Sequence, residues 1–579
     1  MKYRDIKYMM AAVAVGFSLA SCEDFLDRPG EDSYNVNTYY QTDDQLYATA
    51  NTLYNSPWYD VQRGFFKVGE VFAGNYTWGS SPYQTFTLNS TDEDLVNMSA
   101  SLWSVNAYAN TLIKNVNEYA GSKTSDKARK AVKGEALTWK AMAYFYLVRC
   151  WDEVPIVHDN TSDIAGGAYN SVKKADRASV YEYIIMTLEK AIEWLPEKAG
   201  AGRIDRYCAE GLLAKVYLAK AGASGSLNNA DLQKAVEYSK DVINNSGRAL
   251  LPVYSDVFRL ANNTSSESLI AWRWTAEGGT WTSQNSLQSD LIFEGFSEYA
   301  DMWGGWNGPS IGLQDAFNES AQKKERNNVD SRRKATMMMY GDVYDYFWTD
   351  HGGFDYIKHM YDNTEEYKTA HGGKVCGGAF QSPTGANCVK HLVGDNADHV
   401  LGIGHSMARM ATSLATHILR LSDVYLILAE AQALLDGGTT SDAAAVAAYN
   451  AVRQRAIASA APVSSVTWET VFAERRLELA LEGDRWFDYV RLSYYNKDKA
   501  VSYIKNSRRG TWNGLNEYYD PDGGDAVDVS TVVYDDNNDK VIASVDIPFK
   551  MPFPDTDLLM NPNLSAEAEP VDVRAIYSY

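Results

Sequence analysis

The sequence predicts a mainly α-helical protein whose helices are interrupted by a long loop-rich segment. Apolar residues recur at helical spacing in several segments, the strongest of them at residues 126–150. The connections within the first group of segments are short and rich in Gly, Asn or Pro, which favours antiparallel helix pairs. Between about residues 246 and 417 the pattern changes to Trp, Tyr, Gly, Asn and Ser with few periodic runs. The sequence therefore predicts a loop-rich excursion between two helical parts.

The predicted helices fall into two groups. In the first group, Asp43 is a suitable N-cap for a helix through about Tyr54. The other predicted helices are at residues 126–150, 177–194, 207–221 and 231–244, and in the second group at 422–435, 441–458 and 467–489. We therefore expect a helical scaffold at about 43–245 and 418–490, a loop-rich excursion at about 246–417, and a turn-rich C-terminal segment at 491–579.

A faint internal similarity links three of these helices. The pairs Tyr146-Leu147, Tyr217-Leu218 and Tyr425-Leu426 occur in comparable Ala-rich contexts, and the first two are 71 residues apart. That distance is close to two periods of about 34 residues, the length of a tetratricopeptide helix pair. The alternative is three unrelated amphipathic helices, and the pairs alone do not decide between the two.

The N-terminus has the features of an export signal. Basic residues at Lys2, Arg4 and Lys7 precede an uncharged apolar run that is too short to span a bilayer, which predicts a signal peptide at residues 1–21. Small residues followed at once by Cys22 resemble the lipobox of bacterial lipoproteins. We expect Cys22 to be lipidated at the head of a segment covering residues 22–42, with three acyl chains as a durable anchor. The alternative is an ordinary signal peptide that happens to precede a Cys.

Charge and aromatic content limit the class of partner. The chain carries 54 Lys and Arg against 75 Asp and Glu, a formal net charge of -21, which argues against a nucleic-acid partner. Aromatic residues make up 12% of the chain, with 39 Tyr and 15 Trp. This content favours some rings at a binding surface.

The sequence gives only weak support for a catalytic site or a metal site. Glu474, Glu478 and Glu482 follow helical spacing and are interpreted as structural ion-pair partners rather than glycosidase carboxylates. Six of the eight His lie between residues 351 and 405 at spacings that match no metal motif, so we interpret them as solvated loop residues and predict no metal site. The acidic loops 520–525 and 535–539 leave calcium as an alternative to exposed turns.

The five Cys have different expected roles. Cys150 and Cys208 lie in apolar helical runs and are expected to be small buried residues. Cys376 and Cys388 flank a Gly-rich stretch, and in an exported protein these two are predicted to form a disulfide.

The C-terminal third carries a family resemblance. Residues 474–488, the preceding run 418–431, and the closing elements 552–554 and 561–564 together resemble the SusD/RagB family of nutrient-binding lipoproteins. The resemblance extends over nearly the whole chain and includes the Cys-Glu-Asp-Phe-Leu opening at Cys22. The chain departs from the family where it lacks the Gln-Asn pair that commonly follows the Asn-Pro-Asn-Leu element.

The resemblance implies a fold and a function. The fold is mainly α, with tetratricopeptide-like helix pairs supporting a loop-rich subdomain that carries the ligand site. Such a protein is no enzyme and needs no cofactor. It is anchored by lipid in the outer membrane, faces the exterior, captures oligosaccharides and passes them to a SusC-like TonB-dependent transporter. The alternatives are a peptide receptor of the same family and, with less support, an extracellular glycosidase.

Two aromatic clusters are the candidate ligand site. Sugar rings present apolar faces that stack on aromatic rings, and their hydroxyls need polar partners. Both clusters are interleaved with Gly or Ser, so we expect them on accessible loops. The candidates are Asn75, Tyr76, Trp78 and Tyr83 in one cluster and Trp281, Trp303, Trp306 and Asn307 in the other. The alternative for each Trp is a place in the core of the subdomain.

Overall fold

The computed structural model describes residues 36–167, 169–275, 281–296, 302–371, 376, 378–404 and 412–579. The predicted signal peptide and Cys22 lie outside these residues. The prediction of a mainly α-helical chain is confirmed: helices dominate, and the strands are short and pair as seven two-stranded antiparallel ladders in the described part.

The scaffold is a row of helices in which each packs on the next. In order these are α7 (Glu93–Tyr119), α8 (Asp126–Trp151), α10 (Arg177–Trp194), α11 (Arg206–Lys220), α12 (Asn229–Asn245), α19 (Leu421–Leu435) and α20 (Ala443–Ala456). The three Tyr-Leu pairs lie on α8, α11 and α19, which are every second helix of the row. This regularity favours a repeat of helix pairs over three unrelated helices.

Most predicted helix positions agree with the structure, but two details were wrong. Thr42, not Asp43, caps α4 (Asp43–Asn51), because its hydroxyl accepts the Gln45 N–H in a capping box. The predicted helix at 467–489 is two helices, α21 (Trp468–Glu478) and α22 (Arg485–Ser493). They are separated by a turn in which Leu481 and Gly483 both have positive φ.

The longest helix, α7, was not predicted. Its buried face contains Leu95, Leu102 and Leu112, but the remaining positions are rich in Asn and Ser. Those residues compete for backbone hydrogen bonds and weaken the helical signal in the sequence. Asp92 starts the helix by accepting the Leu95 N–H at 3.0 Å. Packing against α8 then stabilises a helix that its composition leaves ambiguous.

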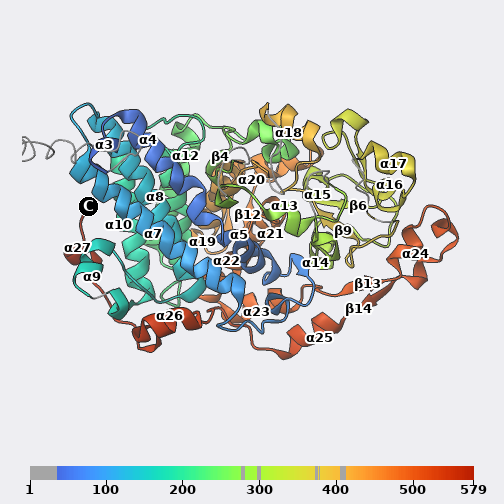
Figure 1. The fold of residues 1–579 in the computed structure, drawn as a ribbon. Helices are drawn as coiled ribbons and strands as arrows, with labels where there is room; N and C mark the ends of the chain where they lie inside the picture. The colour runs from blue at the N-terminus through green and yellow to red at the C-terminus, as the bar shows by residue number, and fades with distance from the viewer. Residues whose placement is uncertain are drawn as a thin grey trace, which may run out of the picture.

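The excursion consists of short elements, most of which lie at one end of the molecule, on the right in Figure 1. They include β4 (Ser268–Trp272), α13 (Leu287–Leu291), β5 (Asn307–Pro309), α14 (Ile311–Ala316), α15 (Ser331–Thr336), α16 (Tyr356–Tyr361), α17 (Glu365–Ala370) and α18 (Asn396–Ile403). A separate apolar cluster, which includes the fully buried Phe293, Phe296 and Trp348, holds this end together. β4 pairs with β10 (Thr416–Arg420), which leads directly into α19 and ties the excursion to the scaffold.

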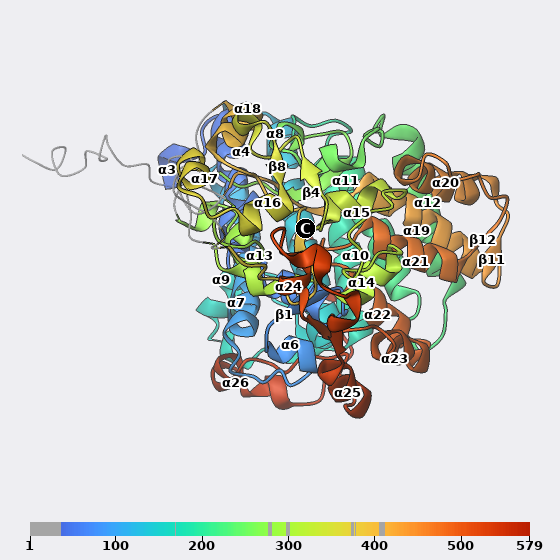
Figure 2. The ribbon, with the colours of Figure 1, turned by 90° about the vertical axis from the view of Figure 1, so that its right-hand side faces the viewer.

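The C-terminal segment runs back along the molecule, as Figure 1 shows at its lower edge. It begins with α23 (Lys497–Lys505) and passes through the ladder of β13 (Thr511–Asn513) and β14 (Val533–Asp535) beside the excursion. It ends at α26 (Asp555–Met560) and α27 (Val573–Ile576), and α27 packs on α10. Figure 2 looks onto the excursion end, with α19, α20 and α21 at one side. The division of the chain into folding units stays a prediction.

The predicted disulfide is wrong. Cys376 and Cys388 are free, and they belong to different apolar clusters. The Cys376 sulfur lies 3.1 Å from that of Met360, whereas Cys388 lies in β9 (Ala386–Cys388) opposite Met337. Twelve residues of separation in sequence therefore did not bring the two thiols together. The expectation for Cys150 and Cys208 is confirmed, since both are fully buried.

The acidic segment 520–525 forms a turn and a short 3-10 helix, whereas 535–539 spans the end of β14 and the start of α25 (Asn537–Ser544), so the expectation of an exposed turn is wrong there. Asp539 accepts hydrogen bonds from the Arg509 N–H and the Tyr534 hydroxyl, each at 2.6 Å. Asp520 accepts the Asp522 N–H at 2.9 Å. Neither loop contributes to a group of three metal-ligating side chains within the described residues. Among those residues, no helix combines the length and apolarity needed to cross a membrane.

Candidate ligand-binding site

A short ladder brings the two predicted aromatic clusters together. Strand β1 (Tyr76–Trp78) pairs antiparallel with β5, so that Trp78 lies opposite Asn307 and Tyr76 opposite Pro309. Trp306 immediately precedes β5. Residues more than 200 positions apart in sequence therefore meet on one ladder, and the sequence contains no local signal for this pairing.

Three Trp side chains remain at the surface beside this ladder. Trp303 is 51% exposed and Trp306 is 67% exposed, and both belong to the short turn around η8 (Gly304–Trp306). Trp78 is half-buried and packs against the main core. The predicted exposure of Trp303 and Trp306 is confirmed, whereas ligand contact stays a prediction. We call Trp78, Trp303 and Trp306 the tryptophan group.

Glycines allow the Trp303 turn to lie close against α13. A Cβ on Gly304 would lie 2.4 Å from the Asp290 carbonyl oxygen, and one on Gly305 would lie 2.0 Å from the Gln381 side-chain oxygen. The Trp303 N–H donates to the Ser289 carbonyl at 3.1 Å. The turn is thus held at van der Waals distance from the helix, and it presents the two indoles outward.

A charged group lies beside the exposed rings. The Trp303 indole N–H donates to the Asp290 carboxylate at 2.6 Å, and the Arg63 Nε lies 3.4 Å from the same carboxylate. Burial raises the pKa of Asp290, while Arg63 and the indole N–H oppose the rise. Arg63 also lies 3.8 Å from Asp94, which forms an ion pair with Lys67. The Arg63 side chain is 46% exposed, so its guanidinium is accessible to a ligand.

Sequence reasoning missed both basic residues of this group. Arg63 lies in α5 (Val61–Phe66) and Lys67 begins a π-helical turn at η3 (Lys67–Val71), a feature that is frequent at functional sites. The Lys67 ammonium lies 4.9 Å from the centre of the Trp78 ring, within range of a cation–π contact. The signal that could have found them is their spacing, because residues four apart share one helix face.

Asn75 is a buried structural residue, so its predicted exposure is wrong. Its side chain donates to Glu70 at 2.9 Å and accepts from the Arg476 Nε at 2.8 Å. Glu70 in turn accepts the Gly483 N–H at 2.7 Å. Burial raises the pKa of Glu70 to about 7, although these hydrogen bonds lower it in part. These contacts join β1 to the turn between α21 and α22.

Tyr76, Tyr83 and Asn307 are also buried, against the prediction. The Tyr76 hydroxyl donates to the Leu291 carbonyl at 3.3 Å, and the Tyr83 hydroxyl donates to Asp92 at 2.8 Å. Asn307 donates to the Asp290 carbonyl at 3.4 Å. These side chains therefore hold the backbone beneath the tryptophan group. The backbone of Trp281 begins η7 (Trp281–Ser283), and its side chain lies outside the described residues.

Comparison with known proteins identifies the family. A profile described as the SusD family matches residues 304–568, and one described as starch-binding, associating with the outer membrane, matches residues 24–218. A SusD-like protein of Bacteroides ovatus is 32% identical over 87% of this chain and 85% of its own length. The chain belongs to the SusD family. The resemblance seen in the sequence is thus confirmed.

Solved structures agree with the assignment to the SusD family. A crystal structure described as containing xylogluco-oligosaccharide is 28% identical, with a TM-score of 0.73 over 92% of this chain and 99% of the other. A laminarin-binding SusD-like protein is 21% identical, with a TM-score of 0.61 over 90% of this chain and 98% of the other. The second likeness supports the fold alone.

The glutamates of the family motif are ion-pair partners, as interpreted from the sequence. Glu474, Glu478 and Glu482 are buried. Arg332 lies 2.7 Å from Glu474 and 3.3 Å from Glu478, and Arg420 lies 2.6 Å from Glu482. In this SusD-like chain the motif therefore stabilises the junction of scaffold and excursion.

The interpretation of the loop histidines as solvated was wrong for most of them. Four of the six are buried, namely His359, His371, His391 and His399. The His359 ring contacts the Gly295 carbonyl at 2.9 Å, and the His391 ring contacts the Leu481 carbonyl at 2.7 Å. Burial lowers the pKa of His359 to about 3 and that of His391 to about 4. These rings pack as neutral side chains in the excursion.

Proposed function

We propose that this protein binds oligosaccharides at the tryptophan group. The observation that supports this most is the exposure of Trp303 and Trp306 on a turn that β1 and β5 place beside Trp78. Sugar rings stack their apolar C–H faces on such indoles. Exposed Trp side chains on a rigid turn cost little conformational entropy when a ligand binds.

The charged residues beside the rings suit the hydroxyl groups of a sugar. Arg63 is half-exposed and reaches toward Asp290, so its remaining N–H groups are available as donors. Asp290 fixes the indole of Trp303 through its N–H and thereby orients the ring. The site thus combines apolar faces with directed donors, which is the combination that carbohydrate recognition needs.

The relatives indicate which ligand to test first. The structure at 28% identity is described with xylogluco-oligosaccharide, so we propose a xylogluco-oligosaccharide as the first probe. We infer that the protein is a binding protein and no enzyme, since its motif glutamates are engaged in buried ion pairs. Chromatography of xyloglucan incubated with the protein should show no products.

The double variant Trp303→Ala/Trp306→Ala tests the binding site. Loss of one stacking face of about 60 Å² at about 25 cal/mol per Å² corresponds to about tenfold in affinity. We therefore expect the double variant to show no measurable binding by calorimetry. Tyr108, which is 50% exposed on α7, provides the matched control, and Tyr108→Ala should bind as the wild type does. Unchanged binding by the double variant, or preferential binding of peptides by the wild type, would contradict the proposal.

We also propose that the protein is anchored at the outer membrane through lipidated Cys22, faces the exterior, and passes its ligand to a SusC-like TonB-dependent transporter. The support is the lipobox-like sequence before Cys22 and a family description that includes outer-membrane association. Cys22→Ala should release the protein from the membrane fraction. Co-purification of the transporter with the wild type tests the second part.

A further inference from the structure

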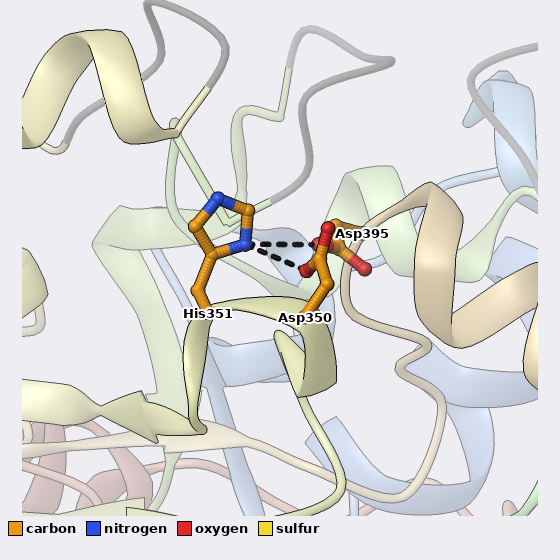
Figure 3. A group of neighbouring side chains, drawn as sticks. All are labelled: Asp350, His351 and Asp395. Atoms are coloured by element: carbon orange, nitrogen blue, oxygen red, sulfur yellow. Dashed lines mark hydrogen bonds and ion pairs between the residues drawn. The ribbon is translucent and has the colours of Figure 1, made fainter.

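A second group of polar side chains lies in the excursion, between η9 (Thr349–His351) and the start of α18. Asp350 and His351 come from the turn, and Asp395 precedes the helix. One ligating atom from each lies within 4.8 Å of the others, an arrangement found at no other place in the described part of the chain. Figure 3 shows the imidazole nitrogen facing both carboxylates.

One of the two distances from His351 matches the separation of ligand atoms around a small metal ion. The His351 Nδ1 lies 3.6 Å from Asp395 Oδ2 and 2.6 Å from Asp350 Oδ1. With bonds of about 2.1 Å, the ligand atoms of a tetrahedral zinc ion lie about 3.4 Å apart. His351 and Asp395 therefore already have a suitable separation. Asp350 needs to move back by about 1 Å, and its side chain is 50% exposed and has room to do so.

The carboxylates of Asp350 and Asp395 favour a bound cation. The Asp395 side chain is only 1% exposed, and its Oδ2 faces His351 while its Oδ1 accepts the Asp398 N–H at 3.0 Å. Neither Asp395 nor Asp350 has a Lys or Arg ion-pair partner in the described residues. Two carboxylates at this distance need a proton or a cation between them.

The two backbone segments are joined by Asp398, a residue outside this group. The Asp398 carboxylate accepts the Trp348 N–H at 2.7 Å and the Thr349 N–H at 3.0 Å, which fastens η9 to α18. Asp395 and Asp398 also form the capping box of α18. The side chains of Asp350, His351 and Asp395 are thus brought together by a rigid support, as a metal site requires.

We propose that Asp350, His351 and Asp395 bind one divalent transition-metal ion, for which zinc is the best match. One imidazole nitrogen and two carboxylate oxygens suit zinc, whereas calcium and magnesium prefer ligand sets made only of oxygen. Three protein ligands leave a coordination position for water. The ion would connect η9 to α18 across 44 residues of chain and stabilise the excursion.

Calorimetric titration of chelator-treated protein with zinc chloride tests this proposal. We expect one zinc ion per protein, and a zinc-dependent rise in the melting temperature. His351→Gln and Asp395→Asn should each weaken zinc binding at least about tenfold. Asn at 395 can still accept the Asp398 N–H, and His351 lies on an exposed turn, so at least one of the two variants should fold.

Asp355→Asn is the matched control. Asp355 caps α16 in the same excursion, where its side chain accepts the Lys358 N–H at 3.0 Å, and it lies outside the three-residue group. This variant should bind zinc as the wild type does. Absence of wild-type binding below about 1 mM zinc would overturn the proposal, because a proton would then suffice between the two carboxylates. Equal binding by the wild type and both ligand variants would also overturn it.

Discussion

The charged residues at the junction of scaffold and excursion and those at the tryptophan group differ in their access to water. At the junction, Arg420 lies 2.7 Å from Glu267, 3.1 Å from Glu478 and 2.6 Å from Glu482, and all four side chains are at most 7% exposed. At the tryptophan group, Arg63 lies 3.4 Å from Asp290 but keeps 46% of its side chain exposed. Both regions thus pair a guanidinium with a carboxylate, but the guanidinium is buried in the first and half-exposed to water in the second.

The difference teaches what each region can do. Removing one partner of a buried pair leaves an uncompensated charge, so the scaffold residues depend on one another. At the tryptophan group the Asp290 side chain is 5% exposed, but Arg63 keeps 46% of its side chain exposed, so water screens this guanidinium and it exchanges partners at a lower cost. The scaffold therefore uses its charges for stability, whereas Arg63 is free to exchange a protein contact for a ligand hydroxyl.

Breaking the scaffold pair should have the largest effect. Arg420→Ala removes the cation shared by the buried Glu267, Glu478 and Glu482, which leaves them with Arg455, Arg332 and Lys390 as basic partners, and should cost about 3 to 5 kcal/mol of stability or prevent folding. Arg63→Ala is the control and should cost clearly less, because Arg63 is half-exposed and Asp290 keeps the Trp303 indole N–H after the change. Melting curves of both variants measure this difference. Similar melting temperatures for Arg420→Ala and Arg63→Ala would show that the two regions do not differ in how much their charges stabilise the fold.

Acid should weaken the scaffold next. Burial alone would raise the pKa of Glu482, but Arg420 and Lys390 lower it to about 2 in the folded protein. The unfolded value is near 4.5, so the stabilisation is present above about pH 4.5 and is lost as the pH falls toward 2. The loss should amount to a few kcal/mol. Glu482→Gln should flatten the melting temperature over this range, and a wild-type-like acid profile would refute the assignment.

Glu70, beneath the tryptophan group, should show the opposite sign. Burial raises the pKa of Glu70 to about 7, so the folded state favours the protonated carboxyl. The stabilisation from protonated Glu70 is full below about pH 4.5 and is lost as the pH rises through 7. Glu70→Gln should remove this decline between pH 5 and 7. Thermal denaturation of Glu70→Gln and Glu482→Gln across these pH ranges measures the difference. The two glutamates should change the melting temperature in opposite directions as the pH rises.

Substitution of an exposed and of a buried Trp sharpens the comparison. Trp306→Ala should weaken oligosaccharide binding about tenfold and leave the melting temperature nearly unchanged, because the ring is 67% exposed. Trp272 is fully buried and stacks on Trp58 with ring centres 5.3 Å apart, so Trp272→Ala should cost about 3 to 5 kcal/mol of stability. A marked drop in melting temperature for Trp306→Ala would show that this ring supports the fold.

The smallest effect should come from Trp303→Phe. This change keeps an aromatic face but removes the N–H that donates to Asp290. Loss of one hydrogen bond that orients the ring should weaken binding about threefold, less than Trp303→Ala does. Binding isotherms of the two variants measure the difference. Equal affinities for both variants would mean that Asp290 does not orient the ring.

The sequence by itself determined the helical scaffold and the family. Amphipathic spacing reports directly on helices such as α10, whose predicted and observed limits are both residues 177 and 194. It failed where polar residues hide the pattern, as in α7, and where positive φ at Leu481 and Gly483 breaks a continuous pattern. The motif glutamates were also interpreted correctly. Charged residues that follow helical spacing among apolar residues usually form ion pairs.

Only the tertiary structure decided which aromatic rings reach solvent. The segments around Tyr76 and Trp303 have similar compositions in the sequence, yet one is buried by the β1–β5 ladder and the other turns outward on Gly304 and Gly305. Local composition carries no information about which loop another segment covers. For the same reason the sequence could not bring Arg63 to Asp290, nor Asp350 and His351 to Asp395. These contacts join distant segments, and their geometry arises from packing rather than from any local preference of the chain.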